Sequence, residues 1–168
     1  MKKILSLAAL VLALTLASCT AREPHPAPPV MEATPEETPV PQQVRRLNEK
    51  SGEGAMAEVK ALLAVNPALA KKKDNDGFTC LHYAAIGDQV ETAAFLIEKG
   101  ADVNAVGPDG RTALHFAAKK GFTEMTELLL EKKAYGNIVD REGKTPMAYA
   151  KEGRFNDIIE LFRSHSCR

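Results

Sequence analysis

A spacing of 33 residues runs through the second half of the chain and limits the folds that are open to it. Three glycines, three threonines and three apolar residues keep this step: Gly77, Gly110 and Gly143; Thr79, Thr112 and Thr145; and Leu81, Leu114 and Met147. Self-similarity at a fixed period of this length is typical of stacked structural units, each of which needs a neighbour to bury its apolar face. The period therefore predicts a stack of similar units.

Each unit has the pattern of two short helices followed by a loop. Thr79 and Thr112 can cap a helix, and the residues after Thr79 that we expect to face neighbouring helices are Leu81, Ala84 and Ala85. A second helix is expected over about 90–98, with Phe95 and Leu96 pointing inward. Its counterparts place Met125, Leu128 and Leu129, and then Ile158, Ile159, Leu161 and Phe162, in the core. Residues 104–109 are expected to form an exposed hairpin.

Two segments carry a resemblance to a known family. DGFTCLHYAA (76–85) and DGRTALHFAA (109–118) resemble the signature of ankyrin repeats, and EKGADVNA (98–105) is similar to the end of that repeat. EGKTPMAYA (142–150) is a weaker copy, and MAEVKALLAVNPAL (56–69) resembles the second helix of an N-terminal capping repeat. The resemblance implies an all-α fold, a short ankyrin-repeat solenoid of about four helix-turn-helix units with hairpin loops. We expect these units at 44–76, 77–109, 110–142 and 143–168, the first and last being caps.

The N-terminus has the pattern of an export signal. Two lysines precede a mainly apolar run over 4–16, and small residues follow at 17–18, which predicts a signal peptide over residues 1–18. Leu16-Ala17-Ser18-Cys19 resembles the lipobox of bacterial lipoproteins. That resemblance implies lipidation of Cys19 and a lipid anchor on the extracytoplasmic side of a membrane, with the outer membrane favoured in a two-membrane cell because Thr20 is not Asp. Two alternatives stay open: a secreted or periplasmic protein with an incidental Cys19, and an uncleaved anchor.

A proline-rich segment separates Cys19 from the repeats. Residues 20–43 contain seven prolines and no apolar period. Such a composition favours extended polyproline II, which does not build a core. We interpret residues 19–43 as a lipidated, disordered tether, with a ligand for a proline-recognition domain as the alternative.

Charge and motifs exclude several functional classes. The chain has 22 basic and 22 acidic residues, so its net charge gives no reason to expect nucleic acid as a partner. The sequence has no glycine-rich phosphate loop, HExxH motif or CxxC pair, so we expect no cofactor, no metal site and no small-molecule substrate. An enzyme whose site is built from scattered residues is the rival hypothesis.

The histidines and cysteines are interpreted as structural. In ankyrin repeats the residues equivalent to Thr79, His82, Thr112 and His115 are structural, and the histidine bonds between neighbouring units. Cys80 is expected to be a small packed residue, and we expect no disulfide between Cys80 and Cys167 because two units would separate them. Cys167 could still pair between two molecules in an oxidising compartment.

The resemblance also implies a binding surface, formed by the hairpins and the exposed side of the first helices. Carried onto this chain, the partner-binding residues are Asn75, Asp76, Phe78 and Ile86; Pro108, Asp109, Arg111, Lys119 and Lys120; and Arg141, Glu142 and Lys144. Phe78 would be an exposed aromatic contact, and Arg111, Lys119, Lys120 and Lys144 would make the groove basic. A solvated charged face with one exposed Phe is the alternative.

These observations favour binding over catalysis. We expect a monomeric, membrane-tethered module that binds, recruits or protects another protein of the cell envelope. A structural envelope protein that binds through its proline-rich segment is the alternative. The sequence does not identify the partner.

Overall fold

The computed structural model describes residues 40–166, which belong to one structural unit. The predicted signal peptide, the lipobox with Cys19 and the tether up to residue 39 lie outside the described residues, as does Cys167. The predictions made on these segments therefore stay predictions.

The described residues are all-helical, as the sequence predicted, and repeat as helix pairs. The elements in chain order are α2 (Val40–Glu53), α3 (Met56–Val65), the 3₁₀ helix η1 (Pro67–Lys71), α4 (Cys80–Ile86), α5 (Val90–Glu98), α6 (Ala113–Lys120), α7 (Thr123–Glu131), α8 (Pro146–Glu152) and α9 (Asn156–Ser166). Within 40–166 the only bridge of β type joins Lys73 to Thr79 and closes the base of a hairpin. None of these helices combines the length and apolar character needed to cross a membrane.

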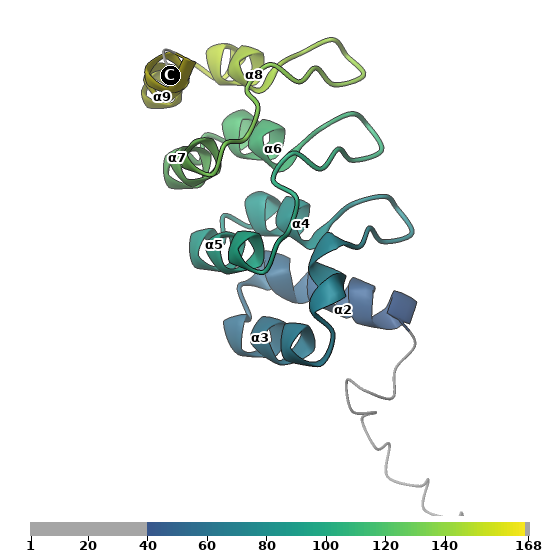
Figure 1. Cartoon of the computed structure of the whole chain (residues 1–168). Helices are drawn as coiled ribbons and strands as arrows, with labels where there is room; N and C mark the ends of the chain where they lie inside the picture. The colour runs from purple at the N-terminus through teal and green to yellow at the C-terminus, as the bar shows by residue number, and fades with distance from the viewer. Residues whose placement is uncertain (1–39, 167–168) are drawn as a thin grey trace, which may run out of the picture. The chain divides into compact units, whose positions relative to one another are not determined.

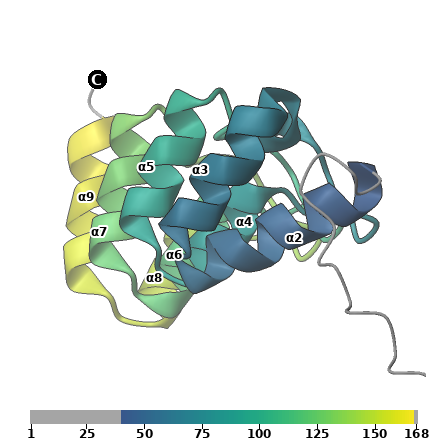
Figure 2. The same ribbon diagram turned by 90° about the horizontal axis from the view of Figure 1, so that it is seen from below.

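The helix pairs stack on one another, so that the first helices, the second helices and the hairpins form three separate layers (Figure 1). The first helices of successive pairs, α4, α6 and α8, pack on one another in order, and α2 packs on α4 at the start of the stack. The second helices, α5, α7 and α9, lie side by side as an outer layer (Figure 2). Within residues 40–166, hairpins over residues 73–79, 106–112 and 139–145 project from the opposite side of the first helices, and we call them fingers. In the structure we count each finger in one unit with the helix pair that follows it.

The first helix begins earlier than the sequence suggests. The tether is expected to extend to residue 43, but α2 starts at Val40, and Gln43 and Val44 are already buried. A proline in the first turn does not interrupt a helix, because the first backbone N–H groups have no partner within the helix. The high proline content therefore hides the start of this helix.

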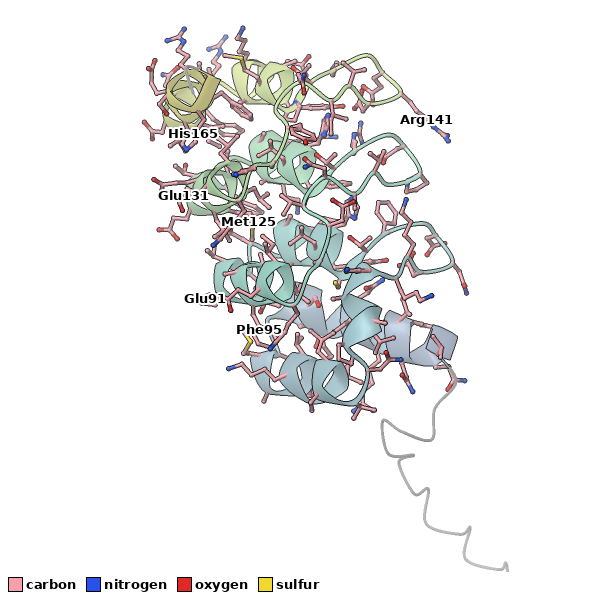
Figure 3. The ribbon with its side chains drawn as sticks, in the orientation of Figure 1. Glu91, Phe95, Met125, Glu131, Arg141 and His165 are labelled. Atoms are coloured by element: carbon pink, nitrogen blue, oxygen red, sulfur yellow. The ribbon has the colours of Figure 1, made fainter. Side chains whose placement is uncertain are left out.

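Small side chains allow the first helices to approach one another closely. Leu81, Ala84 and Ala85 of α4 are fully buried, and the residues at the same register in α6 repeat this pattern. Met125 and Leu129 of α7 are fully buried as predicted, and Met125 points into the stack in Figure 3.

The prediction for Phe95 was wrong in its detail. Leu96 is fully buried, whereas Phe95 is only partly buried and its ring lies between two cations. The ammonium nitrogens of Lys60 and Lys99 are 5.6 and 5.2 Å from the ring centroid. Phe95 therefore covers the edge of the core and does not fill its centre.

Several helices are followed by a residue whose backbone is in the left-handed region. Gly100 has φ of 89°, and the N–H groups of Gly100 and Ala101 donate to the carbonyls of Ile97 and Leu96, the hydrogen-bond pattern of a Schellman motif. The equivalent residue 33 positions later is Lys133, whose φ is 66°. A lysine here carries a strain that glycine avoids, because its Cβ approaches the following carbonyl.

Candidate functional site

Each threonine–histidine pair links the start of a first helix to the base of the next finger. The Thr79 N–H donates to Nδ1 of His82 over 3.1 Å, which fixes Nδ1 as an acceptor and places the proton on Nε2. That Nε2 donates to the carbonyl of Arg111 in the next unit over 3.1 Å. Thr112 and His115 repeat this arrangement toward the carbonyl of Lys144.

Both imidazoles are held as neutral rings. His82 and His115 are buried, and burial lowers the pKa of each below its usual value, against the opposing effect of the carbonyl that each ring contacts. Because both ring nitrogens are used in hydrogen bonds, neither imidazole offers a free lone pair to a metal ion. Within 40–166 no three His, Cys, Asp or Glu side chains gather in a way that could hold a metal ion.

A buried carboxylate holds the base of the last finger. Oδ1 of Asp140 accepts the backbone N–H groups of Glu142 and Lys144 at 2.9 and 3.0 Å. Oδ2 accepts Nε of Arg111 at 3.0 Å and the hydroxyl of Tyr149 at 2.6 Å. Asp140 therefore joins the finger to its own first helix through Tyr149 and to the preceding unit through Arg111.

The same device occurs two units earlier, without a cation. Asp74 stands 66 residues before Asp140 and accepts the backbone N–H groups of Asp76 and Phe78. Its other oxygen accepts the Tyr83 hydroxyl at 2.8 Å and the Asn48 amide at 2.9 Å. Asn48 belongs to the preceding unit, as Arg111 does in the later copy.

Hydrogen bonding controls the ionisation of these carboxylates. Burial by itself would raise the pKa of Asp140, but the Tyr149 hydroxyl, the Lys144 N–H and the Arg111 guanidinium together hold it well below its usual range. The pKa of Asp74 is also lowered by its donors, despite burial. Both fingers are therefore held by ionised carboxylates at neutral pH.

The basic groove that the sequence suggested is largely neutralised. Arg111 is paired with Asp109 at 3.0 Å, with Asp140 at 3.0 Å and with Glu142 at 2.5 Å, and only 15% of its side chain is exposed. Lys144 is paired with Glu142 and with Glu152. Asp109 and Glu142 are close in sequence to Arg111 and Lys144, respectively. The sequence could not show the other partners, because Asp140 and Glu142 lie 29 and 31 residues from Arg111, and Glu152 lies 8 residues from Lys144.

Lys119 and Lys120 are the remaining cations of that predicted set. Both are exposed at the end of α6, and neither has an ion pair within 40–166. The ammonium of Lys119 lies 5.4 Å from the centroid of the Tyr149 ring, and the Lys144 ammonium and the Arg111 Cζ atom lie at 5.2 and 5.3 Å from the same centroid. Three cations therefore surround one aromatic ring, which is a favourable electrostatic environment for them.

Phe78 is not the exposed aromatic contact that the sequence suggested. It is half-buried and packs edge-to-face against His82, Tyr83 and Phe116, with ring centroids 5.6, 6.1 and 6.2 Å away. Phe116 reaches it from the next unit. Phe78 therefore joins two units, and its removal would disturb packing before it disturbed a partner.

The other predicted binding residues occupy the finger tips and one helix end. Asn75, Asp76, Pro108, Arg141 and Glu142 are exposed on the fingers, and Asp109 and the α4 residue Ile86 are partly exposed. Arg141 extends from the tip of the last finger in Figure 3. The Arg141 N–H donates to the carbonyl of Asp109 over 3.0 Å, so these two finger tips touch. Asn75 and Asp76 line a polar hollow of about 510 Å³ together with Asp74, Tyr83 and Asn48.

Sequence reasoning missed the residues that hold the fingers. Asp74 precedes Tyr83 by nine residues, and Asp140 precedes Tyr149 by the same nine, two units later. The middle unit has Gly107 and Phe116 at these two positions, so both partners change together. This coupled change was visible in the sequence and would have identified the pair.

Cys80 has the environment of a packed residue. Its side chain is fully buried, its Sγ donates to the carbonyl of Ala70 over 3.4 Å, and burial raises the pKa of the thiol to about 12. A thiol in this environment is unreactive at neutral pH.

Comparison with known proteins identifies the repeats. Residues 81–130 match the family described as ankyrin repeats (many copies). The chain is also 39% identical over 57 residues to the protein named palmitoyltransferase akr1 of Schizosaccharomyces pombe, covering 34% of this chain and 9% of that protein. It is 53% identical over 38 residues to the palmitoyltransferase akr1 of Aspergillus oryzae, covering 23% of this chain and 5% of that protein.

The chain spans less than a tenth of the length of either relative, so their transferase activity is a statement about those proteins. The ankyrin repeat is a non-catalytic fold that generally mediates binding to other proteins. Its signature residues, the Thr79–His82 and Thr112–His115 pairs, make the bonds that join neighbouring units. The chain therefore carries ankyrin repeats, and its described residues fold as a helical repeat solenoid.

Proposed function

We propose that this chain is an exported, membrane-tethered module that binds another protein of the cell envelope. Its surface for that partner consists of the finger tips and the exposed end of α6. The observation that carries this proposal is that the polar residues fall into two groups. Those at the finger bases are used in bonds between units, whereas Lys119, Lys120 and Arg141, together with the apolar Pro108, are exposed on the surface of the stack.

Rigidity of the fingers favours recognition. Ordering a mobile loop on binding costs free energy, and a surface held in advance avoids that cost. Asp140 fixes the last finger from two units, and Asp74 fixes the first in the same way. The unpaired Lys119 and Lys120 favour a partner with an acidic segment, because opposite charges steer association and set register.

The membrane tether is the second part of the proposal. A lipidated Cys19 and the proline-rich residues up to 39 would hold the repeats at a membrane surface and let them reach partners about 60 Å away. Metabolic labelling with a fatty-acid analogue tests this part. We expect label on the full chain, loss of label in Cys19→Ser, and release of that variant into the soluble fraction. Equal membrane retention without label would refute lipid anchoring.

The partner-binding surface is tested by affinity capture from the native membrane followed by mass spectrometry. We expect one or a few proteins to be retained by the wild-type chain and lost with the paired change Lys119→Glu and Lys120→Glu. The matched control is the paired change Lys72→Glu and Lys132→Glu, which makes the same change in charge at two exposed lysines away from this surface. Equal loss in both variants would indicate a general charge effect and refute the proposed surface.

A further inference from the structure

The turns that follow the second helices are joined by an asparagine. Asn104 follows α5, and its Oδ1 accepts the N–H of Tyr135 over 2.8 Å. Its Nδ2 lies 3.4 Å from the carbonyl oxygen of Lys133 and donates to it. One side-chain amide therefore binds a backbone N–H and a backbone carbonyl two residues apart on the turn after α7.

Asn137 stands 33 residues after Asn104, at the equivalent position after α7, and the turn that it would bind would follow α9. Within 40–166 no turn reaches it. The register that ends α7 at Glu131 would end α9 at residue 164, but α9 continues as a helix to Ser166. Asn137 is exposed, and neither Oδ1 nor Nδ2 of its side chain has a hydrogen-bond partner among residues 40–166.

A hollow of about 1020 Å³ lies beside this amide. Tyr135, Met147 and Phe162 supply apolar walls, and Asn137 and His165 contribute polar groups. Figure 3 labels Glu131 and His165, which come from the ends of α7 and α9 on the outer-helix side of the stack. Tyr135 is 61% exposed and lines the hollow.

The polar groups of this hollow suit a neutral backbone. Nδ1 of His165 lies 2.9 Å from the carbonyl oxygen of Leu161, which can only accept, so Nδ1 carries a proton and donates there. Glu131 and Lys133 contribute one charge of each sign to the rim. The charges of Glu131 and Lys133 on the rim offset each other.

We propose that this hollow binds an extended segment of a partner protein. Asn137 binds a backbone N–H and a backbone carbonyl two residues apart, in the way that Asn104 binds the turn at 133–135. An apolar side chain of the segment packs against Tyr135, Met147 and Phe162. This second surface rests on the proposed function as a protein-binding module, and it is distinct from the finger tips and the end of α6.

Selection from a peptide library tests this proposal and does not require the partner to be identified. The full chain in detergent micelles is panned against phage-displayed random linear dodecapeptides, and enriched peptides are labelled and titrated by fluorescence polarisation. We expect peptides with an apolar residue whose Kd rises roughly tenfold or more in Asn137→Ala, because two hydrogen bonds are lost together. Tyr135→Ala should weaken the same peptides, whereas Lys119→Glu should leave them unchanged.

Each other outcome overturns the inference in a recognisable way. Peptides that depend on Lys119 and not on Asn137 would support the proposed function and refute this second surface. Self-association in sedimentation that disappears in Asn137→Ala would make a second copy the occupant and refute the peptide. Enrichment of no peptide that depends on Asn137 would also refute it, provided that thermal unfolding shows Asn137→Ala to be folded.

Discussion

Replacing Asp140 with asparagine tests whether its carboxylate holds two units together. The change keeps the shape of the side chain, and its remaining oxygen can still accept the two backbone N–H groups of the finger. The new amide nitrogen would face the Arg111 guanidinium and the Tyr149 hydroxyl, both of which now donate to Oδ2. Asp140→Asn therefore removes the oxygen that accepts from the charged Arg111. It also places an amide N–H donor opposite the Arg111 and Tyr149 donors.

The loss of stability can be estimated from these contacts. A hydrogen bond to a charged group contributes about 1.5–3 kcal/mol and a neutral one about 1 kcal/mol. Arg111 keeps Asp109 and Glu142 as partners, so the lower part of that range applies. We expect the free energy of unfolding to fall by about 3 kcal/mol, which lowers Tm by roughly 12 °C in a domain of this size.

Asp74→Asn is the matched control. It stands two repeats earlier and has the same backbone partners, but its side-chain donors are the neutral Asn48 amide and Tyr83 hydroxyl. The Tyr83 hydroxyl can rotate and accept from the new amide, whereas the Tyr149 hydroxyl already accepts from Nη2 of Arg111 at 2.7 Å, so we expect a loss of only about 1 kcal/mol at Asp74. Urea unfolding followed by circular dichroism measures both variants. Equal losses at the two sites would refute the claim that the cation from the preceding unit makes the difference.

The pH dependence gives an independent check on the same residue. The pKa of Asp140 is lower in the folded protein than in the unfolded chain, where it is about 3.9. The carboxylate therefore contributes its full stability above that value and loses it as the pH falls below about 4. The stability difference between wild type and Asp140→Asn should narrow over this acid range, and a constant difference down to pH 2 would contradict the assignment.

Three further predictions concern other parts of the stack. Because the pKa values of His82 and His115 are lowered by burial, stability should fall as the pH drops below about 6.5, by up to about 1.4 kcal/mol per pH unit for each histidine, and a titration of Tm that is flat from pH 7 to 5 would disprove this. Gly87→Ala should lower Tm far more than Gly143→Ala, because a Cβ at Gly87 would collide with the backbone carbonyl at the end of α2, whereas one at Gly143 meets nothing within 4 Å and costs only the left-handed strain at φ of 73°, about 1 kcal/mol; equal shifts would remove the steric explanation. Lys133→Gly should raise the free energy of unfolding by roughly 0.5 kcal/mol by relieving left-handed strain at φ of 66°, and a decrease measured in urea would contradict it.

The sequence predicted the fold well because the repeat is a local pattern. Thr79, His82 and the alanines of α4 lie within one helix turn or two of one another, so their register could be read directly. The start of α2 was missed because prolines suggested an extended segment, whereas tertiary contacts bury Gln43 and Val44. Helix propensity describes an isolated chain, and at the start of α2 the packing of this helix against α4 outweighs the low helix propensity of proline.

The binding surface was predicted less well, because charge on a stack depends on contacts across units. Arg111 and Lys144 look free in sequence, yet carboxylates up to 31 residues away neutralise them. Phe78 looks exposed in sequence, yet Phe116 of the next unit covers it. A residue at a surface position of one repeat becomes an interface residue when its neighbour supplies a complementary side chain. Which side chains remain exposed therefore depends on the contacts between neighbouring units and not on one repeat alone.

The middle unit shows why these repeats are not interchangeable. Its Gly107 and Phe116 replace the aspartate and tyrosine of the units on either side. A side chain at Gly107 would have its Cβ 3.1 Å from the Phe78 ring and 3.3 Å from the Arg111 carbonyl oxygen, so the aromatic packing leaves little room for an aspartate here. Restoring only Asp at 107 would crowd Phe78, and restoring only Tyr at 116 would leave its hydroxyl without the carboxylate that the other two tyrosines bind. The base of this finger is therefore held by aromatic packing in addition to the carboxylates that Arg111 contacts, Asp109 of the same finger and Asp140 of the next one. It should lose a smaller part of its stabilisation in acid than the fingers that Asp74 and Asp140 hold.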